Sequence, residues 1–166
     1  MRALLMAQAR FDSPLGPLTA GATEHGIAGL WFDGQAHHPG PLDAPVDPGH
    51  RWLLRLRRAL DAYWSGARTF DVPLDLHGTP FQQRVWRALL GIAPGRTITY
   101  AQVALGCDAP LAVRAVGAAI GRNPVSIVVP CHRVLGRDGT LTGYAGGLDR
   151  KEALLRLEGV WAHEAT

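Results

Sequence analysis

A change in the spacing of apolar residues near residue 77 is the feature that most constrains how this chain folds. Before it, residues 2–32 alternate short apolar runs with turn residues such as Asp12-Ser13-Pro14-Leu15-Gly16. After it, apolar residues recur mainly at helical spacing. The two patterns predict an α/β (α+β) protein of two domains. Residues 1–76 would form a small antiparallel sheet with a helix, and residues 77–166 a winged helix-turn-helix-like domain.

The first domain is expected to be a strand meander covered by one amphipathic helix. Residues 27–32 form the third candidate strand, and the proline-rich residues 33–49 are expected to form a surface loop. Apolar residues between Trp52 and Trp64 follow helical spacing, which predicts a helix that ends at Ser65. Alternating residues from Asp71 to Gly78 predict a last strand that leads into a linker.

The second domain opens with clear helix signals. Thr79-Pro80-Phe81-Gln82 and Thr99-Tyr100-Ala101-Gln102 both have the pattern of a capping box at a helix start. A third helix is expected to run through Arg114 and Gly121. Two short helices across a tight turn indicate a helix-turn-helix.

The remainder of this domain is expected to place a cysteine at the end of a strand. The β-branched run Ile127-Val128-Val129 predicts a buried strand that Pro130 ends, so that Cys131 lies just beyond it. Glycines around Asp138 indicate a hairpin, a candidate wing. A final helix is expected from Asp149 to Gly159.

Composition limits the function classes. No apolar run is long enough for a membrane span, and two cysteines can build neither a disulfide framework nor a four-cysteine zinc site. We therefore expect a cytoplasmic protein without a metal or cofactor. Residues 1–76 carry 7 basic and 8 acidic residues, whereas residues 77–166 carry 10 and 6. The basic second half is the better candidate for binding a polyanion, although a solvated basic face is the alternative.

Cys131 is the candidate reactive group. His132 and Arg133 follow it directly, and such neighbours lower the pKa of a thiol and favour the thiolate. Adjacent side chains of an extended segment point apart, so a bridging water or a turn would have to join His132 to the sulfur. A buried structural cysteine is the alternative.

Several motifs of the second half closely resemble those of the 6-O-alkylguanine-DNA alkyltransferase (methylated-DNA-protein-cysteine methyltransferase) family. The resemblance covers nearly all of residues 78–160, and its most specific block is Pro130-Cys131-His132-Arg133-Val134. The other matching segments are Phe81-Gln82-Gln83-Arg84-Val85-Trp86, Thr99-Tyr100, Arg114-Ala115-Val116-Gly117, Asn123-Pro124 and Gly143-Tyr144-Ala145-Gly146-Gly147-Leu148.

The resemblance implies irreversible, single-turnover transfer of a methyl or other alkyl group to Cys131. The donor would be the 6-oxygen of guanine, or the 4-oxygen of thymine, in duplex DNA. His132 would take the thiol proton through a water, and Glu158 would hold the imidazole. Tyr100 would donate a proton to the base, and Asn123 would tie the preceding helix to the cysteine segment. The implied substrate pocket consists of Tyr144, Val134, Ala145 and Gly146.

The resemblance also implies that the target base is rotated out of the duplex through the minor groove. Arg114 would take the place of the extruded base. The implied DNA-binding residues are Arg114, Ala115, Gly117, Ala118 and Thr99. The partner would be double-stranded DNA containing alkylated guanine. The protein would act as a monomer and would not bind a membrane. From the residues alone, an Ala/Gly-rich helix face more often indicates tight helix packing. Without the resemblance, Tyr100 would be interpreted as a core or helix-start aromatic and Glu158 as a solvated helix-end charge.

Three other functions remain open on the sequence. A non-catalytic binder of alkylated DNA would need no reactive cysteine, so Cys131 argues against it. A cysteine hydrolase would pair Cys131 with His132, but no oxyanion hole is visible in the sequence. A winged-helix regulator would be expected to carry a dimerisation segment, and none is recognisable.

Overall fold

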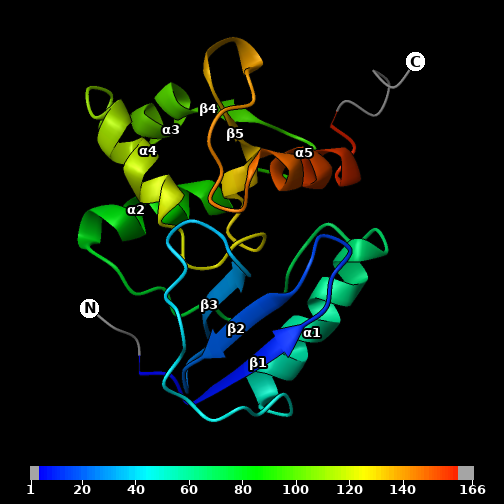
Figure 1. The fold of residues 1–166 in the computed structure, drawn as a ribbon. Coiled ribbons are helices and arrows are strands. Elements are labelled where there is room, and N and C mark those ends of the chain that lie inside the picture. The colour runs from blue at the N-terminus through cyan, green and yellow to red at the C-terminus, as the bar shows by residue number, and fades with distance from the viewer. Residues whose placement is uncertain (1–3, 161–166) are drawn as a thin grey trace. The chain divides into compact units, whose positions relative to one another are not determined.

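The computed structural model describes residues 4–160, so residues 1–3 and 161–166 of the two predicted domains lie outside the described part. The chain forms two compact units (Figure 1). The first consists of the residues up to Gly78 together with Pro124–Ser126, and the second of Thr79–Asn123 together with the residues from Ile127 onward. Strands and helices together give the mixed α/β class that the sequence predicts. Within residues 4–160, no helix combines the length and apolar character that a membrane crossing requires.

The first unit is the predicted meander with its helix. Strands β1 (Ala7–Phe11), β2 (Leu18–Ala22) and β3 (Ile27–Phe32) pair antiparallel in the order β1-β2-β3. Helix α1 (Arg51–Trp64) lies along this sheet (Figure 1) and buries one stripe of side chains. That stripe consists of Leu53, Leu56, Leu60 and Tyr63. Helical spacing in the sequence therefore predicted these four buried residues, whereas Trp52 and Trp64, which share the same spacing, are only half-buried.

The strand predicted between Asp71 and Gly78 does not form. Leu74 makes only an isolated parallel bridge to Ile27, whose amide donates to the Pro73 carbonyl at 2.8 Å. Pro73 has no N–H to give to a ladder, so pairing stays local. The alternation of residues in this segment was therefore a misleading strand signal.

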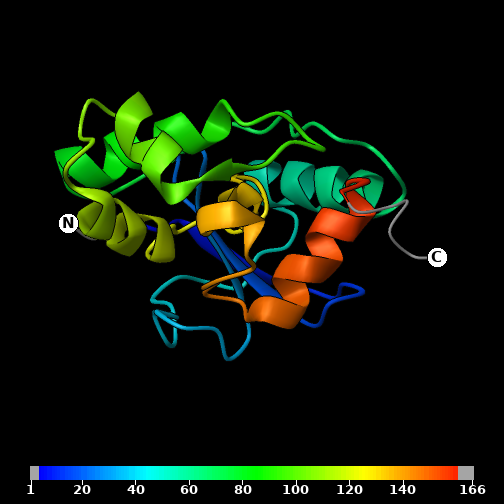
Figure 2. The ribbon, with the colours of Figure 1, turned by 90° about the horizontal axis from the view of Figure 1, so that it is seen from above.

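The second unit gathers its helices around a very short parallel strand pair. Helices α2 (Pro80–Leu90), α3 (Tyr100–Gly106) and α4 (Val113–Gly121) pack on one another. Strand β4 (Ile98–Thr99) pairs parallel with β5 (Val134–Leu135), and helix α5 (Leu148–Leu157) lies on the other side of this pair (Figures 1 and 2).

The two predicted capping boxes are confirmed. Thr79 accepts from the amide of Gln82 while the Gln82 side chain accepts from the amide of Thr79, and Thr99 and Gln102 repeat the arrangement. Each box satisfies two backbone N–H groups that the first helical turn leaves without partners. A further hydrogen bond anchors the helix-turn-helix to α2, because the buried Trp86 indole of α2 donates to the Ala119 carbonyl of α4 at 2.8 Å.

The strand predicted at residues 127–129 is wrong. These residues form turns, and Ile127 has a positive φ of 74° that no strand residue adopts. The Cys131 amide donates to the Val129 carbonyl at 2.8 Å across Pro130, whose φ of −82° and ψ of 62° define an inverse γ-turn. The strand propensity of these β-branched residues is overridden, because the backbone forms turns here and does not pair with another strand.

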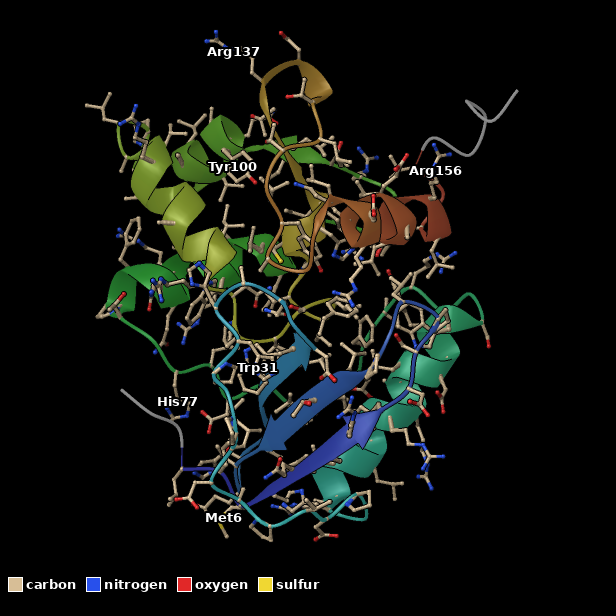
Figure 3. The ribbon with its side chains drawn as sticks, in the orientation of Figure 1. Met6, Trp31, His77, Tyr100, Arg137 and Arg156 are labelled. Carbon is tan, nitrogen blue, oxygen red and sulfur yellow. The ribbon has the colours of Figure 1, made fainter. Side chains whose placement is uncertain are left out.

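The predicted hairpin wing is a turn without paired strands. Gly136 donates to the Thr140 carbonyl at 2.8 Å, and the short 3-10 helix η2 (Arg137–Gly139) lies between them. Figure 3 shows Arg137 at the outer tip of this loop. The loop then returns through Thr142 and Gly143 to the start of α5.

Candidate active site

Cys131 begins the 3-10 helix η1 (Cys131–Arg133) and is 5% exposed. The Asn123 side-chain amide donates both to the Val129 carbonyl at 2.8 Å and to the Cys131 sulfur at 3.1 Å. Asn123 lies two residues after the last residue of α4, so one amide joins the end of that helix to the turn that presents the thiol. The predicted tie between these two segments is present.

The burial of Cys131 favours its neutral thiol form over the thiolate. Burial raises the pKa of Cys131, while hydrogen bonds from Asn123 and Tyr144 and the positive charge of Lys151 act in the opposite direction. The net effect is the opposite of the lowered pKa that the sequence predicts, because the loss of hydration outweighs the hydrogen bonds and the nearby charge. Ionisation must therefore be coupled to a base.

His132 is a suitable base, and Glu158 holds it. The imidazole Nε2 lies 2.8 Å from a Glu158 carboxylate oxygen, and both side chains are fully buried. Burial lowers the pKa of His132 even though Glu158 acts to raise it. A neutral ring whose Nε2–H donates to Glu158 leaves Nδ1 as an acceptor, and within residues 4–160 Nδ1 has no hydrogen-bond partner.

Arg133 completes this network, a role that sequence reasoning missed. Its Nε and Nη2 donate to the two Glu158 oxygens at 2.8 and 2.9 Å, and its Nη1 donates to the Ile92 carbonyl. The guanidinium fork thus compensates the buried carboxylate and fixes its orientation. These contacts direct the Arg133 guanidinium to Glu158 and Ile92 and not to the Cys131 thiol.

A cavity of about 120 Å³ opens beside the thiol. Its lining consists of Tyr100, Gly117, Ile120, Gly121, Cys131, Gly143, Tyr144 and Ala145. Of the four predicted pocket residues, Tyr144 and Ala145 are in this lining. Val134 is fully buried in the β4–β5 pair and Gly146 lines a different hollow at the start of α5, so neither contributes a wall.

Tyr100 stands at the start of α3 beside the loop that follows β5 (Figure 3). Its hydroxyl donates to the Thr142 carbonyl at 3.2 Å. Burial and the negative charge that Cys131 can carry raise the pKa of Tyr100, so the phenol keeps its proton at neutral pH. Tyr100 can therefore donate a hydrogen bond into the cavity.

Helix α4 presents small residues on its outer face. Val116, Ala119 and Ile120 are buried, whereas Arg114, Ala115 and Ala118 are exposed and Gly117 is half-buried. Helix packing thus uses only the inner face, and the outer small-residue face is open for docking. Thr99 lies at the start of α3, where its side chain is engaged in the capping box.

Comparisons with known proteins agree on one family. Residues 80–160 match the family model described as 6-O-methylguanine DNA methyltransferase, DNA binding domain. A Mycobacterium tuberculosis protein named methylated-DNA–protein-cysteine methyltransferase is 49% identical over 148 residues, which cover 89% of this chain and 88% of the relative. A Methanosarcina acetivorans protein of the same name is 46% identical over 155 residues, with coverage of 93% and 99%.

Solved structures give the same result. The crystal structure of Mycobacterium tuberculosis OGT in complex with DNA matches with a TM-score of 0.85 and 46% identity, over 92% of each chain. Fold, site and relatives together define the class of cysteine methyltransferases that carry this DNA-binding domain. The chain belongs to the methylated-DNA–protein-cysteine methyltransferase family, as the sequence motifs implied.

Proposed function

We propose that this protein repairs alkylated DNA by moving a methyl or other alkyl group from the 6-oxygen of guanine to the sulfur of Cys131. The observation that carries the proposal is the position of the thiol. It lies in the wall of a small cavity, hydrogen-bonded to Asn123, and the next residue is the buried base His132. Family membership supports the same reaction. The 4-oxygen of thymine offers the same chemistry and is a second proposed donor.

The proposed reaction is a displacement at a saturated carbon. The Cys131 proton passes, through a water, to Nδ1 of His132, and the thiolate attacks the alkyl carbon. A carbon–sulfur bond forms as the carbon–oxygen bond breaks, and the electron pair moves into the guanine ring. Tyr100 supports this departure by donating its proton to a ring nitrogen, so that guanine leaves as the neutral base, and the phenolate then regains a proton from solvent. Glu158 holds His132 in the required tautomer and stabilises the imidazolium.

The proposed reaction occurs once per molecule. Its product is a thioether, and reversing it would require a nucleophile that attacks the new carbon–sulfur bond. The described site offers no further thiol for this step, because the sulfur of Cys107 lies at the end of α3 near the Arg84 carbonyl and not in the cavity lining. We therefore infer stoichiometric, irreversible transfer.

DNA would bind to residues 77–166, with residues 1–76 as the supporting domain. The target oxygen is inaccessible within a base stack, so the nucleotide must be rotated into the cavity. The small exposed face of α4 can approach a minor groove about 6 Å wide, and the exposed Arg114 can fill the place of the extruded base. We propose that one monomer carries out this step. Two free cysteines accord with a reducing compartment, which supports a cytoplasmic location.

Mass spectrometry tests the proposal. After incubation with a duplex that carries one methylated guanine, the peptide containing Cys131 should gain a single methyl mass, with one methyl per molecule. Cys131→Ser should lose the transfer yet bind the duplex within about threefold of wild type, since the sulfur makes no phosphate contact. A non-catalytic binder would gain no mass, and a cysteine hydrolase would release products with multiple turnovers. Either result would overturn the proposal.

A further inference from the structure

The first unit contains a second cavity, of about 350 Å³, that the proposed alkyl transfer does not use. Its size falls within the range of about 300–1,000 Å³ that is usual for small-molecule sites. This Trp31 pocket lies between residues 4–5, Trp31 of β3 and the loop residues 39–43, and His77 and Pro124 complete its wall. All of these residues belong to the first unit. The Trp31 pocket shares no lining residue with the cavity beside Cys131.

Two glycines shape the floor of the Trp31 pocket. Gly21 of β2 and Gly29 of β3 are directly paired in the sheet. A Cβ on Gly21 would lie 3.1 Å from the δ carbons of Leu5, and a Cβ on Gly29 would overlap the six-membered ring of Trp31. Because glycine has no side chain, Leu5 and Trp31 can lie directly against the strands. The indole is therefore held flat along β3 as a half-buried wall (Figure 3).

The loop that forms the opposite wall is fastened to the unit. The Gln8 side chain donates to the Leu42 carbonyl at 3.0 Å. His38 accepts from the Gly40 amide at 2.9 Å through Nδ1, and its ring centre lies 6.1 Å from that of Trp31. A site whose walls are already held in place needs little ordering when a ligand enters. The Trp31 pocket is thus formed before any ligand arrives.

The electrostatics of the Trp31 pocket favour a positive ligand. Its described lining is apolar except for the exposed Asp43 and the half-buried His77, and it includes neither lysine nor arginine. His77 Nε2 lies 3.0 Å from one oxygen of Asp75, and the other oxygen accepts from the Thr23 hydroxyl at 2.6 Å. Burial acts to raise the pKa of Asp75, but the hydrogen bonds from Thr23 and His77 lower it overall, so this carboxylate is ionised at neutral pH. Two carboxylates therefore stand at or near the pocket.

The walls also restrict the shape of a ligand. A flat ring system gains the most contact by stacking on an indole, and a cation placed over the indole face is attracted to the π electrons. Asp43 adds charge complementarity at the exposed side of the pocket. An anion would be repelled by both carboxylates, and a neutral ring would gain only the stacking.

We propose that the Trp31 pocket is a binding site for a small planar organic cation, which stacks on Trp31 with its positive charge directed to Asp43. The site goes beyond the proposed alkyl transfer, since none of the residues assigned to that reaction lines it.

Three probes of nearly the same shape test the ligand chemistry: the cation N-methylquinolinium, quinoline, which is neutral at neutral pH, and the anion naphthoate. Each is titrated into the full-length protein and followed by two-dimensional amide NMR, which gives both affinity and location. N-methylquinolinium should bind with a Kd of about 0.1–1 mM, as expected for a ligand of this size. It should bind about tenfold more tightly than quinoline, and naphthoate more weakly than either. The largest shifts should fall on the Trp31 indole N–H and on residues 39–43.

Two substitutions separate charge from stacking. Asp43→Asn should weaken N-methylquinolinium about threefold to fivefold and leave quinoline unchanged, because only the charge contact is lost. Asp47→Asn is the matched control, since it neutralises an exposed acid of the same loop outside the lining and should change neither affinity. Trp31→Leu should weaken N-methylquinolinium about tenfold. Thermal unfolding of each variant shows whether it is folded, and methyl transfer by Asp43→Asn should equal that of wild type.

The outcomes are distinguishable. Equal affinities for the cation and quinoline, an unchanged cation affinity in Asp43→Asn, or shifts centred on the cavity beside Cys131 would each overturn the proposed site. Absence of methyl transfer in wild type would refute the proposed function and leave the Trp31 pocket untouched. If Trp31→Leu does not fold, the three probes and the Asp43→Asn and Asp47→Asn pair decide.

Discussion

Replacing Glu158 with glutamine removes the buried charge on which His132 and Arg133 both depend. The carboxylate accepts two hydrogen bonds from Arg133, at 2.8 and 2.9 Å, and contacts His132 at 2.8 Å. Glutamine keeps one oxygen but turns an NH₂ group toward groups that are themselves donors. Arg133, whose residue is 5% exposed, would then carry a buried cation without its counterion.

The expected loss of stability follows from this geometry. Removing one partner of a buried ion pair costs about 3–5 kcal/mol, and the retained oxygen places Glu158→Gln at the lower end, about 3 kcal/mol. For a chain of this length that corresponds to a fall in Tm of about 6–12 °C. Transfer to Cys131 should slow as well, because His132 loses the group that fixes its tautomer.

Thermal and urea unfolding followed by circular dichroism measure the effect. Glu152→Gln is the control, since it breaks the half-exposed Glu152–Arg156 pair and should change stability by less than about 0.5 kcal/mol. Combining Glu158→Gln with Arg133→Met should cost less than the two single changes added together, because the stranded cation is removed. If Glu158→Gln unfolds like Glu152→Gln, the reasoning about the buried network is refuted.

Three further predictions concern DNA and pH. Arg114→Ala, at an exposed position, should slow repair of duplex by about tenfold or more while sparing attack on a free alkylated base, and equal losses on both substrates would contradict the flipping role. Duplex affinity, measured by fluorescence anisotropy, should fall as salt rises because phosphate contacts release counterions; a flat dependence would exclude the basic second half as the DNA face. Because burial lowers the pKa of His132, the unfolded state binds a proton at this residue at a higher pH than the folded state does. The free energy of unfolding should therefore fall as pH drops below about 6.5, by at most about 1.4 kcal/mol per pH unit from this group. Urea titrations at several pH values measure this slope, and His132→Asn should flatten it.

Local signals in the sequence predicted local structure well. The capping boxes at Thr79 and Thr99 form as expected, since the residues that bond lie three positions apart. The stripe on α1 was equally visible, because helical periodicity and burial coincide. The motifs around Cys131 implied the family, and with it the contact between His132 and Glu158.

Features set by distant partners could not be predicted in this way. Ile127 and its neighbours favour a strand, yet the Asn123 amide and the Pro130 turn determine their backbone. Arg133 was expected to act on the adjacent thiol, but its actual partner lies 25 positions away. Lys151 on a helix would ordinarily be solvated, and only the fold shows that its ammonium is enclosed.

The bond between the Trp86 indole and the Ala119 carbonyl has a mechanical consequence for DNA binding. It anchors α4 to α2 by a buried contact, so this helix cannot slide along its neighbour without losing that bond. In the proposed complex α4 therefore behaves as a rigid wedge. The work of widening the groove and unstacking the base then falls on the duplex, and lesions that already weaken base pairing would be the easiest to process.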